Sequence, residues 1–286
     1  MKVLIIGKGG QLAWELERLS PEGIEVECVG KSELDIADEL NVANYIKNMK
    51  PDLVINAAAY TAVDLAEENI EKAYSVNDLG VRYLAKACKK VGTRILHIST
   101  DFIFDGLSTS PYHTDALTNP LSVYGASKLA GELALKEILP EKSMIVRTSW
   151  VYSANGNNFV KSMLRLMNQR NSLNIIYDQV GTPTWAKGLA QWLWIMASKS
   201  EVTGTYHWTD AGVASWFDFS IAIQELALEK GLLDKAIPVL PILTSDYPSP
   251  ARRPAFSVLN KTSAEDISGL NTVHWRKQLS SMMDEL

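Results

Sequence analysis

Short, largely apolar runs alternate with longer amphipathic segments through the first half of the chain. Runs of four to six residues of this kind are typical of strands buried on both faces of a parallel sheet. We expect strands at 3–6, 25–29, 53–56, 94–99 and 143–147, and helices at 11–19, 42–49, 71–91 and 126–135. Strands and helices in alternation predict an α/β fold with a doubly wound parallel sheet.

The regular alternation fades beyond residue 150. This part holds most of the tryptophans and a series of prolines, namely Pro183, Pro238, Pro241, Pro248, Pro250 and Pro254. Proline interrupts helices and central strands alike. We therefore expect one domain at 1–150 and a smaller C-terminal α/β lobe at 151–286 that caps the first domain, with segments around 165–195 returning to it.

Composition and charge narrow the class of protein. The net charge is −5 with no long basic run, which argues against a nucleic-acid partner. Cys28 and Cys88 stand apart in apolar contexts, so we expect reduced thiols in a cytoplasmic protein. Met1 leads directly into the first predicted strand and the apolar run at 189–197 is short, so we expect neither a signal peptide nor a membrane span.

A glycine-rich turn joins the first predicted strand to the first helix, with the sequence Gly-Lys-Gly-Gly-Gln-Leu-Ala over 7–13. Gly7 and Gly10 allow a tight turn and a close approach of a pyrophosphate, which the helix N-terminus attracts. Ala13 supplies the third small residue of a G-x-x-G-x-x-[GA] pattern, where helix and strand pack closely. The turn predicts a Rossmann-like dinucleotide-binding domain over 1–150; an ordinary strand–helix turn is the alternative.

The end of the second predicted strand bears on the choice of dinucleotide. An acidic residue there would bind the adenosine 2′-hydroxyl of NAD. The chain has Gly-Lys-Ser at 30–32 instead, and Lys31 can face a 2′-phosphate. We expect NADPH as the cofactor, with NADH also possible; a solvated Lys31 without a ligand is the alternative.

Polar or small residues follow two further strands at the edge where ligands of such sheets bind. Asn56 precedes three alanines and Tyr60, which let a cofactor lie against the backbone or simply pack tightly. Ser99, Thr100 and Asp101 end the fourth strand. A hydroxyl here can hydrogen-bond a reacting carbonyl oxygen, or it can serve the turn itself.

Tyr124 and Lys128 are four residues apart at the start of a predicted helix. Residues at i and i+4 share a helix face, so the phenol and the amine are expected side by side. A neighbouring cation favours the phenolate and lowers the tyrosine pKa. A proton donor beside a dinucleotide predicts hydride transfer to a carbonyl, although each residue alone is common on helix surfaces.

Taken together these segments resemble the extended short-chain dehydrogenase/reductase superfamily that acts on nucleotide sugars, and within it the dTDP-4-dehydrorhamnose reductase family. The matching segments run in order over most of the chain: 7–12, 34–36, 56–64, 99–106, 124–132, 147–152, 156–159, 178–184, 204–207 and 253–254. The resemblance implies NADPH-dependent reduction of the C4 keto group of dTDP-4-dehydro-β-L-rhamnose to dTDP-L-rhamnose, for a surface polysaccharide. It also implies that the C-terminal lobe binds the substrate.

The resemblance assigns roles to individual residues. Tyr124 donates the proton, Lys128 lowers its pKa and holds the nicotinamide ribose, and Thr100 hydrogen-bonds the reacting oxygen. The implied cofactor-binding residues are Gly7, Gly10, Gln11, Leu12, Lys31, Asp35, Ile36, Ala57, Ala58, Tyr60, Tyr124 and Lys128. The implied substrate contacts are Thr100, Asp101, Tyr124, Trp150, Asn158 and Arg253, the last suited to a diphosphate. Asn77 resembles a position that supports the proton relay, or it is structural.

Other readings remain open at this point. A 4,6-dehydratase would carry a second acid after Asp101, where this chain has Phe102. A reductase of another dTDP-4-keto-6-deoxysugar is an alternative, as is a non-catalytic NADP-binding regulatory subunit. We expect a monomer or homodimer. Some members of the family dimerise through Mg²⁺ bound by glutamates, and Glu15 matches one such position. The other ligands are not apparent and the four histidines lack metal-ligand spacing, so we predict no metal site.

Overall fold

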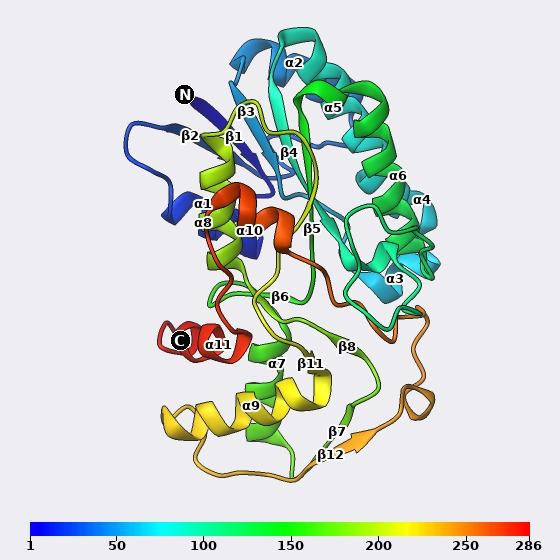
Figure 1. Cartoon of the computed structure of the whole chain (residues 1–286), viewed down its shortest axis with the longest axis vertical. Coiled ribbons are helices and arrows are strands. Elements are labelled where there is room, and N and C mark those ends of the chain that lie inside the picture. Colours follow the sequence, from blue (N-terminus) through cyan, green and yellow to red (C-terminus); the bar gives the residue numbers. More distant parts are fainter.

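The computed structural model describes all residues, 1–286. Its centre is a six-stranded, all-parallel sheet in the order β10-β5-β4-β3-β1-β2 (Figure 1). The strands are β1 (Lys2–Ile6), β2 (Glu25–Val29), β3 (Leu53–Asn56), β4 (Arg94–Thr100), β5 (Ser143–Thr148) and β10 (Gly204–His207). The predicted α/β fold with a doubly wound parallel sheet is confirmed, and the five predicted strands lie within a residue of their expected bounds.

Helices cover both faces of this sheet because the strands are apolar on both sides. One face packs on α1 (Gln11–Arg18), α8 (Ala186–Ala197) and α10 (Thr262–Ser268). The other packs on α2 (Glu39–Met49), α5 (Gly80–Val91) and α6 (Val123–Ile138). Successive residues of β1 alternate between the two cores, Val3 and Ile5 in one, Leu4 and Ile6 in the other.

The long helix expected at 71–91 is not one regular α-helix. The chain forms α3 (Val63–Glu68), α4 (Ile70–Tyr74), a π-helical turn at Ser75–Leu79 and then α5. Helical propensity does not reveal such a turn, which often marks a functional segment. It carries Asn77, whose carbonyl carbon and oxygen lie so near Gly131 of α6 that a Cβ there would come within 2.2 Å of the oxygen.

The C-terminal lobe has its own core, formed by α7 (Phe159–Gln169), α9 (Trp216–Glu229) and α11 (Trp275–Met283). Its strands are short and pair in twos: β6 (Val151–Tyr152) with β9 (Thr184–Trp185), β7 (Leu173–Ile176) with β12 (Val239–Ile242), and β8 (Val180–Gly181) with β11 (Ala214–Ser215). Short 3₁₀ turns at Asp101–Ile103, Pro140–Lys142 and Thr244–Asp246 complete the elements.

The segments that return to the first layer differ in part from those expected around 165–195. Helix α8 lies in that range and packs on α1, whereas the end of α7 and strand β7 belong to the C-terminal core. The sixth sheet strand, β10, and helix α10 return later in the chain. The sequence does not separate these segments because α7 and α8 both carry apolar residues, and only tertiary contacts decide which core each one joins.

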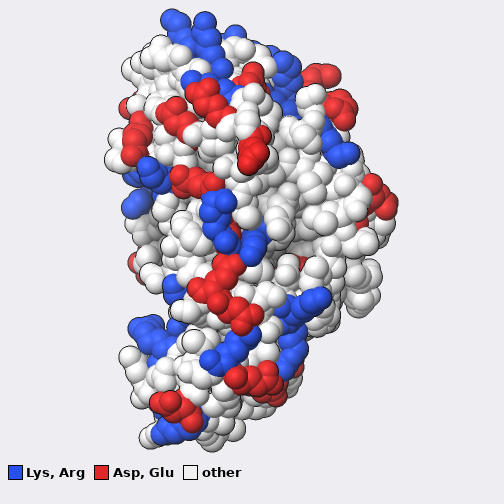
Figure 2. Space-filling view, turned by 90° about the vertical axis from the view of Figure 1, so that its left-hand side faces the viewer, with Lys and Arg blue, Asp and Glu red and all other residues white.

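The surface carries charges of both signs. On the face shown in Figure 2 basic and acidic side chains are interspersed over both lobes. No helix combines the length and the apolar character that crossing a bilayer requires.

Candidate active site

A cavity of about 900 Å³ opens at the carboxyl ends of β1, β3, β4 and β5. It runs from the glycine-rich turn to the start of α6 and on to the C-terminal lobe. Every catalytic, cofactor-binding or substrate-binding residue that the resemblance implies lines it except Asn158, and Asn77 does not line it either. Strand ends of a parallel sheet meet at one edge, which is why segments far apart in the sequence converge here.

The glycine-rich turn forms the floor at one end. Gly7 has φ +120°, and a Cβ there would lie 3.0 Å from the carbonyl carbon of Ala57. Gly10 precedes α1, which no side chain caps. The first backbone N–H groups of α1 are therefore available to an anion such as a pyrophosphate, favoured also by the helix dipole.

We expect Gly7→Ala to weaken NADPH binding by at least about 10-fold, because the methyl group meets the backbone of 57–58 in a conformation that L-residues avoid. A fluorescence titration with NADPH measures it. Gly23→Ala is the matched control, since Gly23 has φ +76° but open space around its Cβ position. Equal loss of NADPH binding in both variants would mean that a strained backbone anywhere weakens binding. The close approach of Gly7 to Ala57 would then not be the cause.

The turn after β2 carries charges of both signs. Lys31 is 3.4 Å from Asp35, and its side chain is 74% exposed. Glu33 accepts hydrogen bonds from the Gly30 N–H and the Ser32 hydroxyl. The carboxylate of Glu33 is therefore occupied by its own turn, while Lys31 remains accessible to a phosphate at the cavity rim.

Tyr124 and Lys128 lie one turn apart on α6, beside the end of β4. Ser122 caps this helix by accepting a hydrogen bond from the Gly125 N–H. A Cβ on Gly125 would come within 2.2 Å of the Phe102 carbonyl oxygen, so only glycine lets the helix start so close to the strand end. This contact sets Tyr124 beside Thr100.

The expectation that Lys128 lowers the pKa of Tyr124 is wrong for this arrangement. Burial raises the pKa of Tyr124 to about 12; a hydrogen bond with Thr100 opposes this shift, and the charge of Asp101 adds to it. The amine of Lys128 instead donates to the Ile98 carbonyl oxygen at 2.6 Å. Tyr124 thus keeps its proton at neutral pH, the form that a proton donor needs.

Asp101 is a second acid at this place. Burial raises its pKa to about 6, and hydrogen bonds from Ser257 and Thr100 oppose the shift. Its Oδ1 accepts from the Thr100 hydroxyl at 3.1 Å, and its buried Oδ2 has no partner. Oδ2 is therefore an unused acceptor beside the reacting position.

Asn77 bonds the loop after β3, which faces the cofactor cavity, and makes no hydrogen bond to the amine of Lys128. Its Oδ1 accepts from the Tyr60 N–H at 2.9 Å, and its Nδ2 donates to the Tyr60 carbonyl oxygen and the Ser127 hydroxyl. These contacts join the π-helical turn, the loop after β3 and α6. Of the two readings left open for Asn77, the geometry favours the structural one.

Two stacked indoles mark the border with the C-terminal lobe. Trp150 has φ +47°, an uncommon conformation for a bulky residue. Its ring lies 3.5 Å from that of Trp216, centroid to centroid, and nearly parallel to it. Gly181 has no Cβ that could collide with Trp150. Trp216 was missed from the sequence, since only the fold brings α9 to this border.

Arg253 lines the cavity and is already oriented. Its guanidinium pairs with Asp64 at 2.7 Å and donates to the Ser249 hydroxyl. The Arg253 hydrogen bond also holds the pKa of the Asp64 carboxyl below its ordinary value, although burial opposes this. The partner Asp64 lies within a matching segment, but nothing in the sequence links it to Arg253.

Asn158 does not line the cavity. Its side chain caps α7 by accepting from the Lys161 N–H, and it donates to Gln11 Oε1 at 2.9 Å. The cap and the bond to Gln11 engage this side chain, and the substrate contact expected for Asn158 stays a prediction. Gly156 and Asn157, just before it, line the cavity instead.

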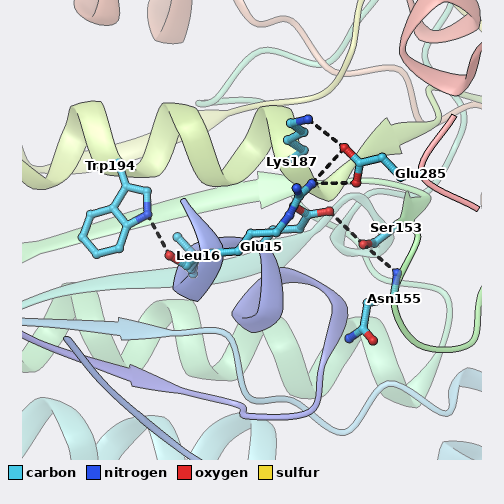
Figure 3. Close-up of polar contacts among 8 residues, drawn as sticks. Glu15, Leu16, Ser153, Asn155, Lys187, Trp194 and Glu285 are labelled. Carbon is cyan, nitrogen blue, oxygen red and sulfur yellow. Dashed lines mark hydrogen bonds and ion pairs between the residues drawn. The ribbon is translucent and has the colours of Figure 1, made fainter. Parts of the chain in front are cut away.

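Glu15 bonds the loop that precedes Asn158 (Figure 3). It is fully buried, and its Oε1 accepts from the Ser153 hydroxyl at 2.9 Å, which in turn accepts from the Asn155 N–H. Arg18 pairs with both Glu15 and Glu285, and Lys187 pairs with Glu285 at 2.7 Å.

The glutamates at this place do not fit a divalent ion. Each carboxylate is neutralised by a cation of the chain itself, Arg18 for Glu15 and both Arg18 and Lys187 for Glu285. A metal ion needs several free oxygen ligands. No group of three or more His, Cys, Asp or Glu side chains in the structure is arranged to hold one.

Comparison with known proteins places this geometry in a family. The model of the RmlD substrate binding domain matches residues 1–286. A dTDP-4-dehydrorhamnose reductase of Aggregatibacter actinomycetemcomitans is 42% identical over 288 residues, covering 98% of each chain.

Solved structures of proteins with the same name have the same fold as this chain. A dTDP-4-dehydrorhamnose reductase of Clostridium acetobutylicum superposes with a TM-score of 0.93 at 39% identity, covering 99% of both chains. One from Bacillus anthracis, in complex with NADP, has a TM-score of 0.91 at 35% identity, covering 100% of this chain and 99% of that one. The chain described here therefore belongs to the dTDP-4-dehydrorhamnose reductase family.

Proposed function

We propose that this protein reduces the C4 keto group of dTDP-4-dehydro-β-L-rhamnose with NADPH, giving dTDP-L-rhamnose for a surface polysaccharide. The observation that carries the proposal is the meeting of Thr100, Tyr124 and Lys128 with the glycine-rich turn in one cavity. The relatives' names and the NADP complex of the Bacillus anthracis protein support it.

The side chains divide the chemical work among them. The dihydronicotinamide of NADPH supplies the hydride when bound. Tyr124 supplies the proton for O4, and its raised pKa keeps that proton in place until an alkoxide develops. The Thr100 hydroxyl, which donates to Asp101 Oδ1 in the structure, would turn its proton to the same oxygen. Lys128 contributes positive charge and orients the nicotinamide ribose.

We assign the two ends of the dinucleotide to different residues. Gly7, Gly10, Gln11 and Leu12 bind the pyrophosphate, and Ala57, Ala58 and Tyr60 support the nicotinamide half. Lys31, Asp35 and Ile36 border the adenosine, with Lys31 facing the 2′-phosphate. This division is consistent with 1–150 as the cofactor domain and 151–286 as mainly the substrate lobe.

The nucleotide end of the substrate extends toward the C-terminal lobe. A second cavity of about 760 Å³ shares Trp216 and Arg253 with the first and is lined by apolar side chains such as Phe159 and Met163. Arg253 would bind the diphosphate with the edge of its guanidinium not used by Asp64. Trp150 closes the sugar site on the same side.

We expect Arg253→Ala to raise KM for the dTDP-sugar by about 10- to 100-fold, the effect of losing hydrogen bonds to a charged group. KM for NADPH should stay nearly unchanged. Steady-state kinetics with each substrate varied in turn separates the two. Arg165→Ala is the control, an exposed arginine on α7 that lines neither cavity. A rise in KM for both substrates would show that Arg253 supports the whole cavity and does not specifically bind the diphosphate of the sugar.

One assay distinguishes the remaining readings. Purified protein is given several dTDP-4-keto-6-deoxysugars with NADPH or NADH, and loss of reduced cofactor is recorded with product stereochemistry. Preference for another keto sugar would favour the sister reductase. NADP binding without turnover of any sugar would favour a regulatory subunit.

Cellular setting and assembly belong to the same proposal. We place the protein in the cytoplasm, where dTDP-sugars and NADPH are available and where free cysteines such as Cys28 and Cys88 stay reduced. We expect a monomer or homodimer and no bound metal.

A further inference from the structure

The amine of Lys128 is held by two groups of β4. It donates to the Ile98 carbonyl oxygen at 2.6 Å and lies 3.3 Å from His97 Nε2. Lys128 is 2% exposed and His97 is fully buried. The imidazole is therefore a fixed neighbour of the amine on the side away from the solvent.

His97 is itself held from the next strand. In the parallel pairing of β3 and β4, Asn56 is the register partner of His97. Asn56 Nδ2 is 3.0 Å from His97 Nδ1, and Asn56 Oδ1 accepts from the Ala58 N–H at 3.2 Å. A polar chain thus runs inside the protein from the amine of Lys128 to a backbone N–H at the wall of the cofactor cavity.

The surroundings of His97 favour a neutral imidazole. Burial lowers the pKa of His97 well below its ordinary value, and the charge of Lys128 lowers it further. A neutral ring has one N–H donor and one acceptor nitrogen. A Lys128 ammonium can only donate, so it requires an unprotonated Nε2, whereas a neutral amine can either accept from an Nε2–H or donate to Nε2.

The two tautomers suit the two states of the amine. With its proton on Nε2, the ring donates to a neutral Lys128 amine and accepts from Asn56, which keeps the Ala58 N–H. With its proton on Nδ1, the ring accepts from a Lys128 ammonium, and the Asn56 amide turns its oxygen toward the ring and gives up the Ala58 N–H. The bond to Ala58 therefore favours the Nε2 tautomer once the amine is neutral.

We propose that His97, held by Asn56, is a positioning residue for Lys128, and that its ring exchanges tautomers as the amine gains or loses a proton. The amine then keeps one place in both states. The part of this idea that concerns turnover rests on the proposed function, whereas the tautomer exchange does not.

The surroundings favour an amine that changes state near neutral pH. Burial lowers the pKa of Lys128 to about 8, against the charge of Glu132 that raises it. The titratable groups around the amine are His97 on β4 and, one helical turn to either side on α6, Tyr124 and Glu132. Asp101 at the end of β4 acts on Tyr124.

Ring nitrogen NMR on protein with ¹⁵N-labelled histidine tests the tautomer exchange without any substrate. The chain has four histidines, and His97→Asn identifies the signals of His97. From about pH 6 to about pH 10 we expect the protonated and unprotonated nitrogens of His97 to exchange roles. In Lys128→Met the proton should stay on Nε2 throughout. Signals that do not change in the native protein, or that change alike in both proteins, would overturn the proposal.

Two substitutions of one chemical kind test the positioning role. His97→Gln keeps an amide at the place of Nε2, which can turn either end to Lys128. His97→Asn is shorter, keeps the contact with Asn56 and loses the one with Lys128. We expect Gln to keep kcat within about 3-fold, and Asn to lower it by about 10- to 100-fold and to displace the alkaline limb of the kcat–pH profile.

Thermal unfolding and NADPH titration accompany the kinetics. If His97→Gln and His97→Asn both unfold near the native temperature and lose the same fraction of kcat, the contact with Lys128 does not matter. His97 would then serve only the packing of the interior. The same conclusion follows if His97→Asn has an unshifted pH profile. If no sugar is turned over even by the native protein, the NMR result still decides the tautomer exchange.

Discussion

Tyr124→Phe should lower turnover of the 4-keto sugar by a factor of about 10²–10⁴, because the variant lacks the proton that the developing O4 alkoxide requires. The ring keeps its place, since its edge-on contact with Phe102, at 5.5 Å between centroids, does not involve the hydroxyl. Stopped-flow measurement of NADPH oxidation in a single turnover isolates the chemical step.

Cofactor binding provides the control for this substitution. NADPH affinity should stay within a few-fold of the native value, since the glycine-rich turn and Lys128 are untouched. Near-full activity in Tyr124→Phe would remove the proposed proton donor, and Asp101, with its unpartnered Oδ2 and raised pKa, would become the candidate acid.

Glu132→Ala should destabilise the protein by about 3–5 kcal/mol, because it leaves a buried guanidinium without its counter-charge. Arg147 and Glu132 are almost fully buried and form a bidentate pair, with 2.7 Å between Arg147 Nη2 and Glu132 Oε2. Arg147 also donates to the Thr114 carbonyl oxygen and lies 3.3 Å from His207 Nε2. The pair thus joins β5, α6 and β10, and denaturant unfolding measures its loss.

Glu137→Ala is the matched control on the same helix. The Glu137 side chain is 74% exposed, and its ion pair with Arg82 is long, at 3.7 Å. Because exposed ion pairs contribute little, removing Glu137 should lower the free energy of unfolding by less than about 1 kcal/mol. Replacing both buried partners, as in Glu132→Leu with Arg147→Met, should recover much of the stability because no charge is left unpaired. If Glu132→Ala proved as stable as Glu137→Ala, the buried pair would not support the fold.

The limits of the sequence are clearest where one side chain has several possible partners. Asn158 is in a matching segment and was expected to contact substrate, yet it caps α7 and bonds Gln11, 147 residues earlier. His97 is one residue in a strand pattern, and its tie to Lys128 appears only when β4 packs under α6. Trp216 lines the cavity and stacks on Trp150, although the two residues are far apart in the sequence.

The pKa of Tyr124 is a second example. The spacing of Tyr124 and Lys128 correctly predicts a shared helix face, and electrostatics between neighbours would then lower the phenol pKa. In the folded protein burial dominates and raises it to about 12, while the amine turns to β4. Desolvation depends on all surrounding atoms, so it cannot be read from a pair of residues.

The sequence by itself determined the features that rest on local rules: the alternation of buried strands and helices, the turn that only glycine can adopt at Gly7, and the placing of a phenol and an amine on one helix face. The tertiary structure decided which lobe each later segment joins, how Asp64 orients Arg253, and which groups surround Lys128. These depend on contacts between residues distant in the chain, such as the 189 positions between Asp64 and Arg253, where many pairings satisfy the same local pattern.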